Sequence, residues 1–180
     1  VGHKWADLSE GDYGVSLIND CKYGHDIRDN VMRLSLLKSP TWPHEHADEG
    51  EHHFTYWLYP HHDNLIEDTI SVAYRLNHHV RVVDGVASDK PHFLKPLVEA
   101  EGVIIETIKR AEDGDGVIIR CYEPYRRRGW AQFIMAFPIK SAHICNLLED
   151  DLEAVDMTDE GRFSVYVRPF QIITLRLRLA

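Results

Sequence analysis

Three features are missing from this 180-residue sequence: a long apolar run, a secretory leader and a disulfide framework. No stretch approaches the roughly 20 consecutive apolar residues of a membrane-spanning helix, and no basic segment followed by an apolar one opens the chain. The three cysteines, Cys21, Cys121 and Cys145, form no CxxC pair, and no Asn-x-Ser/Thr sequence occurs. We therefore expect no membrane partner and a reducing, cytoplasmic location.

Positive charge is also scarce, because 20 Lys and Arg stand against 29 Asp and Glu and give a net charge of −9. This balance disfavours non-specific binding to nucleic acid or to anionic membranes, so we expect no nucleic-acid partner. Hydrophobic residues make up 44% of the chain and charged residues 27%, which is typical of globular domains.

Alternation of apolar and polar residues dominates the sequence and predicts an all-β, antiparallel fold. Expected strands are 14–19, 31–37, 52–59, 80–83, 93–98, 103–109, 116–122, 131–138, 143–147, 162–167 and 171–179. One segment differs: between 63 and 77, Ile66, Ile70, Ala73 and Tyr74 recur at helical spacing. They predict one short helix with Asp63 or Asn64 as its N-cap.

Residues 84–96 contain Gly85, Pro91 and Pro96 and are the best candidate linker. We place a domain boundary near residue 90. The second domain, 91–180, is then a compact sandwich of about seven strands. Residues 113–116, Asp-Gly-Asp-Gly, predict a hairpin turn between two of its strands, because glycine tolerates positive φ. The chain begins Val-Gly-His without Met, and we expect it to be the end of a longer polypeptide.

Several long strings resemble one family, the α-mannosidases of glycoside hydrolase family 38, and most closely its cytosolic and bacterial branch. They are residues 3–9 (HKWADLS), 17–26 (LINDCKYGHD), 33–40 (RLSLLKSP), 47–52 (ADEGEH), 103–116 (VIIETIKRAEDGDG) and 169–177 (PFQIITLRL). The resemblance is to the C-terminal region of these enzymes. It implies that 1–90 is the C-terminal part of a large β-sandwich, the end of a supersandwich, and that 91–180 is a terminal, smaller, Ig-like sandwich.

The resemblance also implies a metal-dependent, retaining exo-α-mannosidase that hydrolyses terminal α-mannosyl residues. In this family the zinc ligands and catalytic carboxylates lie in an N-terminal α/β barrel, so we expect neither catalytic residues nor metal ligands in this chain. Zinc or another divalent metal would be bound outside it. Expected partners are the barrel of the same chain and mannosides or oligosaccharides, and a homo-oligomer is left open. The alternative is a freestanding carbohydrate-binding or interaction module.

Residues 19–26 are the stretch richest in polar and ionisable side chains, at the point where a strand ends and a polar loop begins. Sugars are held by planar polar groups and an aromatic face, so Asp20, Lys22, Tyr23 and Asp26 are candidate contacts to mannose. The same loop could equally be a turn that docks the sandwich on the barrel. A catalytic pair of Asp20 and Asp26 is disfavoured, because nothing fixes the separation that a retaining mechanism requires.

Other motifs favour structural interpretations. Six histidines, His44, His46, His52, His53, His61 and His62, suggest a metal site, but neighbours such as His52 and His53 would point to opposite faces of a strand. Trp42, flanked by prolines, suits core packing better than sugar stacking. We expect 126–128 (Arg-Arg-Arg) and 149–151 (Glu-Asp-Asp) to be solvated loops, and Phe133, Met135 and Phe137 to face the core.

Overall fold

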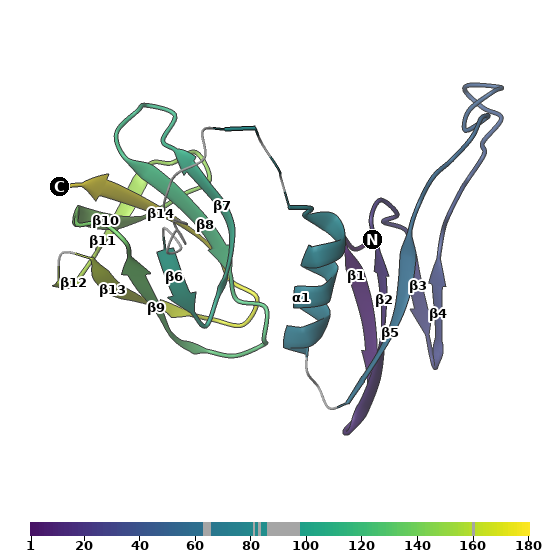
Figure 1. Cartoon of the computed structure of the whole chain (residues 1–180), viewed down its shortest axis with the longest axis horizontal. Helices are drawn as coiled ribbons and strands as arrows, with labels where there is room; N and C mark the ends of the chain where they lie inside the picture. The colour runs from purple at the N-terminus through teal and green to yellow at the C-terminus, as the bar shows by residue number, and fades with distance from the viewer. Residues whose placement is uncertain (63–65, 81, 83, 86–97, 160) are drawn as a thin grey trace. The chain divides into compact units, whose positions relative to one another are not determined.

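The computed structural model describes residues 1–62, 66–80, 82, 84–85, 98–159 and 161–180. The chain divides into two compact units, Val1–Gly85 (unit 1) and Val86–Ala180 (unit 2). Its strands pair in antiparallel fashion and there is one helix among the described residues (Figure 1). The all-β prediction with a single short helix is therefore confirmed.

Unit 1 is built on a three-stranded antiparallel sheet in the order β1-β2-β5. Its strands are β1 (Trp5–Ser9), β2 (Tyr13–Asn19) and β5 (Tyr56–His62). A separate hairpin pairs β3 (His25–Arg28) with β4 (Val31–Leu34). Helix α1 (Ile66–Asn77) lies along β1 and β2 (Figure 1).

Helix α1 packs through two of the side chains that its periodicity predicts. Ile70 and Ala73 are buried, and Ala73 and Leu76 form a small core with Ile18 of β2. Tyr74, also predicted for this face, is half-buried, with the Lys4 ammonium 4.3 Å from its ring centroid. The proposed N-caps, Asp63 and Asn64, lie outside the described residues.

A buried polar cluster, which we call the Asp7 cluster, lies on the same face of the sheet and reaches helix α1. The Asp7 carboxylate accepts hydrogen bonds from Ser9, from Ser16 Oγ at 2.6 Å and from His61 Nε2 at 2.8 Å. Ser16 Oγ also lies 2.6 Å from Thr69 Oγ1 of α1. Burial alone would raise the pKa of Asp7, but the hydrogen bonds from Ser16, Ser9 and His61 hold it below its ordinary value. No local pattern in the sequence predicts this cluster.

Unit 2 contains two antiparallel sheets, β11-β10-β14-β8-β7 and β12-β13-β9-β6. The strands of the first sheet are β7 (Ile104–Arg110), β8 (Val117–Tyr122), β10 (Ile139–Cys145), β11 (Asp151–Val155) and β14 (Ile172–Leu179). Those of the second are β6 (Val98–Glu101), β9 (Gly129–Met135), β12 (Met157–Asp159) and β13 (Arg162–Val167). The described residues therefore form more strands than the seven predicted, because β11 and β12 are only five and three residues long and give a weak local signal.

The core of unit 2 lies between its sheets. Phe133 and Phe163 stack there with ring centroids 4.9 Å apart, beside the fully buried Leu175 and Leu177 of β14. Phe133 and Met135 are buried and Phe137 packs against them, as predicted. The hairpin turn at 113–116 is also confirmed between β7 and β8, with Gly114 at φ +81° and Gly116 at φ +102°.

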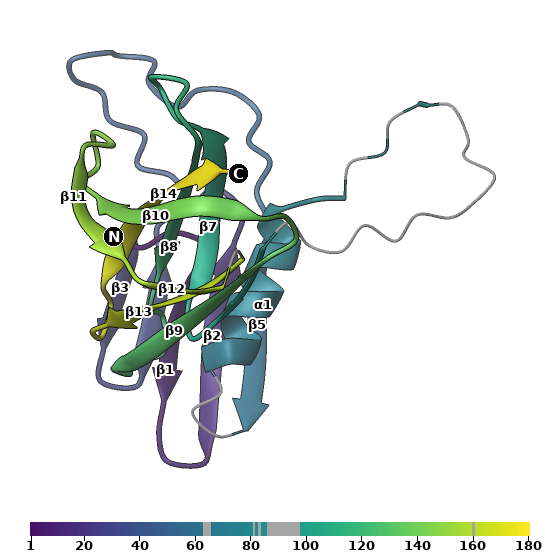
Figure 2. The ribbon, with the colours of Figure 1, turned by 90° about the vertical axis from the view of Figure 1, so that its left-hand side faces the viewer.

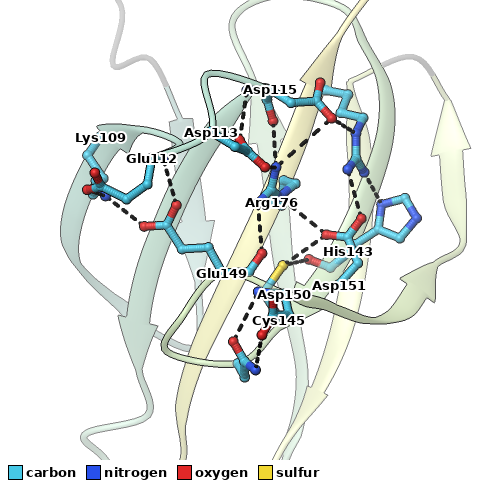
Figure 3. Close-up of polar contacts among 12 residues, drawn as sticks. Lys109, Glu112, Asp113, Asp115, His143, Cys145, Glu149, Asp150, Asp151 and Arg176 are labelled. Carbon is cyan, nitrogen blue, oxygen red and sulfur yellow. Dashed lines mark hydrogen bonds and ion pairs between the residues drawn. The ribbon is translucent and has the colours of Figure 1, made fainter.

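A network of charged side chains covers the outer side of the larger sheet (Figure 3). Arg176 of β14, with a side chain only 6% exposed, contacts Asp113 at 2.6 Å and Asp151 at 3.3 Å. Its guanidinium also donates to the carbonyls of Glu149 (2.7 Å) and Asp115 (3.1 Å). Next to it, Arg178 bonds Asp115 at 2.7 Å and Asp151 at 2.8 Å.

This network corrects the prediction that 149–151 is a solvated turn as far as Glu149 is concerned, whereas Asp150 is exposed as predicted. The Glu149 side chain is 4% exposed and accepts from Lys109 Nζ at 2.6 Å and from the Glu112 amide at 2.8 Å. The Lys109 hydrogen bond and the Glu112 amide lower the pKa of Glu149. Sequence could not reveal these partners, because they lie about 40 positions upstream. The 126–128 loop, in contrast, is exposed as predicted.

Other local predictions were wrong. Trp42 is 84% exposed rather than packed. His52 and His53 precede strand β5 and are not part of it. Val80 and Val82 belong to no strand and are more than 90% exposed, so the strand at 80–83 is not formed at its described positions. The strand predicted at 93–98 lies outside the described residues except for Val98, which begins β6.

Candidate functional site

The candidate site is the connection from β2 to β3, where the sequence predicted contacts to sugar. Asn19, the last residue of β2, is fully buried and holds this connection in place. Its Oδ1 accepts from the Lys22 amide at 2.7 Å, and its Nδ2 lies 3.3 Å from His25 Nε2. Asn77 of α1 donates to the Asn19 carbonyl at 3.0 Å. The loop is therefore anchored to both the sheet and the helix.

Asp20 ties the loop to the start of β5. Both of its carboxylate oxygens lie 3.0 Å from the Thr55 amide, and its own amide donates to the Thr55 carbonyl at 3.2 Å. The hydrogen bond from the Thr55 amide lowers the pKa of Asp20. This carboxylate is an anion at neutral pH that already serves a structural contact.

Lys22 and Tyr23 keep their polar ends available. The Lys22 ammonium lies 4.9 Å from the Phe54 ring centroid, and in the described part of the chain no carboxylate pairs with it. The Tyr23 ring stacks on His3 at 4.5 Å, and the residue is 48% exposed. No residue of the described ranges bonds its hydroxyl. The Tyr23 side chain is thus held by its ring, and the Lys22 ammonium by a cation–π contact.

Asp26 lies apart from the loop, because it is already part of β3. Its carboxylate pairs with Arg33 of β4 at 2.7 Å, and both side chains are more than half exposed. The structure therefore gives Asp26 a cross-strand partner on the hairpin, and such exposed pairs contribute little to stability.

A shallow pocket of about 300 Å³ lies beside Lys22. Its other lining residues are Ser35, Leu36, Leu37, Lys38, Asp48 and His52. Asp48 accepts from the Ser39 amide at 3.0 Å, and its carbonyl lies 2.8 Å from His52 Nε2. Of the four predicted contacts only Lys22 reaches this pocket. Asp48 was not predicted as a site residue, although it lies in segment 47–52, which resembles the α-mannosidase family.

The histidine-rich segment does not fit a metal ion. His46 pairs with Glu49 at 2.9 Å, His53 with Glu51 at 3.1 Å, and His61 belongs to the Asp7 cluster. Among the residues that the structure describes, no three His, Cys, Asp or Glu side chains converge as a metal site would require. No metal chemistry is therefore assigned to these residues.

Comparison with known proteins bears on both units. The family description "Glycosyl hydrolases family 38 C-terminal domain" matches residues 1–46, and "Glycosyl hydrolases family 38 C-terminal beta sandwich domain" matches residues 102–175. "Alpha-mannosidase G" of Dictyostelium discoideum is 38% identical over 98% of this chain. "Alpha-mannosidase 2C1" of Homo sapiens is 33% identical over 98%, and "Alpha-mannosidase" of Saccharomyces cerevisiae is 33% identical over 97%.

This chain spans only 17–18% of the length of these relatives. No helix among its described residues is long and apolar enough to cross a membrane. Two descriptions of the same family match one unit each, in chain order, and the relatives align along nearly all of the chain. The chain therefore belongs to the C-terminal region of glycosyl hydrolase family 38.

Proposed function

We propose that this chain is the C-terminal, non-catalytic portion of a metal-dependent, retaining exo-α-mannosidase that hydrolyses terminal α-mannosyl residues. The observation that carries the proposal is the alignment of proteins named α-mannosidase with 97–98% of the chain. Residues 1–90 are then the C-terminal part of a large β-sandwich domain, and 91–180 the terminal small one. The compact units that meet at Gly85 are compatible with this division.

The carboxylates around the candidate site support a catalytic centre elsewhere in the polypeptide. A retaining glycosidase needs two carboxyl groups about 5–5.5 Å apart, of which one acts as nucleophile and the other as acid and base. Asp20 is instead occupied by the Thr55 amide, and Asp26 by Arg33. The described residues also offer no metal site. Zinc or another divalent metal would be bound in an N-terminal catalytic barrel.

The role that we assign to the chain is to brace this barrel and to shield one side of the mannose site from water. In this role, Lys22 and Tyr23 are the proposed direct contacts to mannoside hydroxyls. The Lys22 ammonium and the Tyr23 hydroxyl have no hydrogen-bond partner among the described residues. Asp20 and Asp26 would hold the loop and the hairpin that carry them. The proposed location is the cytoplasm, in keeping with three cysteines that form no disulfide.

The test of the activity compares the full-length natural protein with the isolated 180-residue chain on an aryl α-mannoside, with and without a chelator. We expect chelator-sensitive hydrolysis by the full-length protein and none by the isolated chain. Hydrolysis by the chain alone would place the catalytic carboxylates here and refute the assignment. If neither protein hydrolysed the substrate, the proposed mannosidase function would be refuted.

The test of the loop uses Lys22→Ala and Tyr23→Phe in the full-length protein. Loss of a hydrogen bond to a charged donor costs about 1.5–3 kcal/mol, so Lys22→Ala should lower kcat/KM by about tenfold to a hundredfold. Lys140→Ala is the matched control, because Lys140 is an exposed lysine of β10 with no ion pair in the described part of the chain. Equal kinetics for Lys22→Ala and Lys140→Ala would leave the loop with a purely structural role.

A further inference from the structure

A second pocket, in unit 2, has the chemistry of a sugar-binding site. It has a volume of about 430 Å³, and its lining comes from β9, β10 and β13 and from the segment that runs from β11 into β12. These strands are labelled in Figure 2. Trp130 of β9 and Tyr166 of β13 line it and are directly opposite each other in the strand pair. Their ring centroids are 5.5 Å apart and the ring planes are inclined by 77°. We call this the Trp130 pocket.

The two aromatic residues are unusually accessible for their size. Trp130 is 68% exposed and Tyr166 is 48% exposed, although the neighbouring inward-facing residue Val165 is buried. An exposed indole and phenol offer large apolar faces at little cost in side-chain entropy. Such faces bind flat or C–H-rich ligands.

Polar side chains complete the lining. Glu153 comes from β11 and Asp156 from the single residue between β11 and β12, whereas Thr158 and Ser164 come from β12 and β13. Within the described ranges none of these four side chains is engaged in a hydrogen bond or ion pair, so their oxygens remain available to a ligand. Two apolar lining residues, Ile144 and Val155, also pack against the core, which holds this part of the pocket in place.

This combination selects one class of ligand. A pyranose presents C–H groups that pack on an aromatic face, and hydroxyls that donate to carboxylates and exchange hydrogen bonds with Ser and Thr. Two carboxylates without a cationic partner disfavour an anionic ligand, and the volume lies within the range of small-molecule sites. We propose that the Trp130 pocket binds a neutral oligosaccharide. The inference rests on the proposed function, which makes mannosides available as ligands.

The test is calorimetric titration of the 180-residue chain with an α-linked mannopentaose. Trp130→Ala removes the aromatic face, and Glu153→Gln keeps the shape of the lining but removes one charge. Each should weaken binding, Trp130→Ala by about tenfold or more. Trp42→Ala is the control, because Trp42 is an even more exposed tryptophan that lies outside the pocket, in unit 1. Circular dichroism of each variant checks that the sheets persist.

Selective loss of binding in Trp130→Ala and Glu153→Gln, with Trp42→Ala unchanged, would support the pocket. The proposal would be overturned if the wild-type chain showed no saturable binding at about 1 mM sugar. It would also be overturned if Trp130→Ala and the wild type bound the sugar with equal affinity. An equal loss in Trp42→Ala would also overturn it, since the effect would then belong to any exposed indole. Aryl-mannoside hydrolysis by the full-length protein separates the two proposals. Hydrolysis without Trp130-dependent binding refutes only the pocket, and Trp130-dependent binding without hydrolysis refutes only the mannosidase function.

Discussion

Replacing Arg176 by methionine should destabilise unit 2 by about 3 kcal/mol. Arg176 is the more deeply buried of the two arginines in the charge network, with a side chain 6% exposed, and it lies on the central strand of the larger sheet. Methionine fills much of the same space but supplies neither the charge nor the donors. The carbonyls of Glu149 and Asp115 would lose a charged donor.

The magnitude follows from what each partner loses. Breaking a buried ion pair by removing one side costs about 3–5 kcal/mol. The lower end applies here, because Asp113 is 56% exposed and Asp151 is 32% exposed, so water can replace part of the lost interaction. Arg178→Met is the matched control. Its side chain is 26% exposed and its partners are similar, so we expect a cost of about 1 kcal/mol.

The assay is native-state amide hydrogen exchange on the whole chain, because it reports the free energy of opening for each unit separately. The amides of Ile119 in β8 and Leu175 in β14 lie in the core of unit 2. In Arg176→Met their exchange should accelerate on the order of a hundredfold, and in Arg178→Met by about fivefold. Equal protection in Arg176→Met and wild type would refute the reasoning, and so would a larger effect of Arg178→Met.

Two further predictions concern the Asp7 cluster and the hairpin turn. The pKa of Asp7 is lowered, so the cluster should stabilise unit 1 fully above the unfolded-state pKa of about 3.9 and lose this contribution as pH falls through the folded-state pKa. Urea unfolding followed by tryptophan fluorescence should show that Asp7→Asn lowers the free energy of unfolding by about 2 kcal/mol at pH 7 and by less at pH 3. The control Asp26→Asn removes an exposed carboxylate and should change this free energy little. A loss for Asp7→Asn that does not depend on pH would contradict the prediction. Gly116→Ala should destabilise unit 2 by more than about 2 kcal/mol, because φ is +102° and the new Cβ would lie 2.3 Å from the Leu177 carbonyl oxygen. Gly129→Ala meets nothing within 4 Å and should be nearly neutral in a thermal melt; equal melting temperatures for the two variants would be incompatible with the strained turn.

Local patterns predicted the parts of the fold that depend on local order. Alternation located β13 at its observed bounds, and three- and four-residue spacing located α1. The turn at 113–116 followed from its glycines. These features are set by side-chain periodicity and by backbone sterics, which act over a few residues and can be read from one sequence.

Long-range pairing accounts for what the sequence did not predict. Glu149 was predicted to be solvated, because no residue near it in the sequence indicates that Lys109 is its partner. The Asp7 cluster joins positions 54 residues apart, and so it was missed. At the candidate site the sequence grouped four residues alike. It could not separate Lys22 and Tyr23, whose polar groups have no hydrogen-bond partner among the described residues, from Asp20 and Asp26, whose carboxylates are bonded to Thr55 and Arg33.

The strand order of unit 2 has a consequence for how the chain is made. β14 is the last strand of the chain, yet it lies in the middle of its sheet, with β10 on one side and β8 on the other. Until residues 172–179 have left the ribosome, these two neighbours have no strand between them and leave open edges. Unit 2 should therefore complete its folding only after β14 has emerged. A premature stop codon that removed β14 would cost the centre of the sheet rather than its margin.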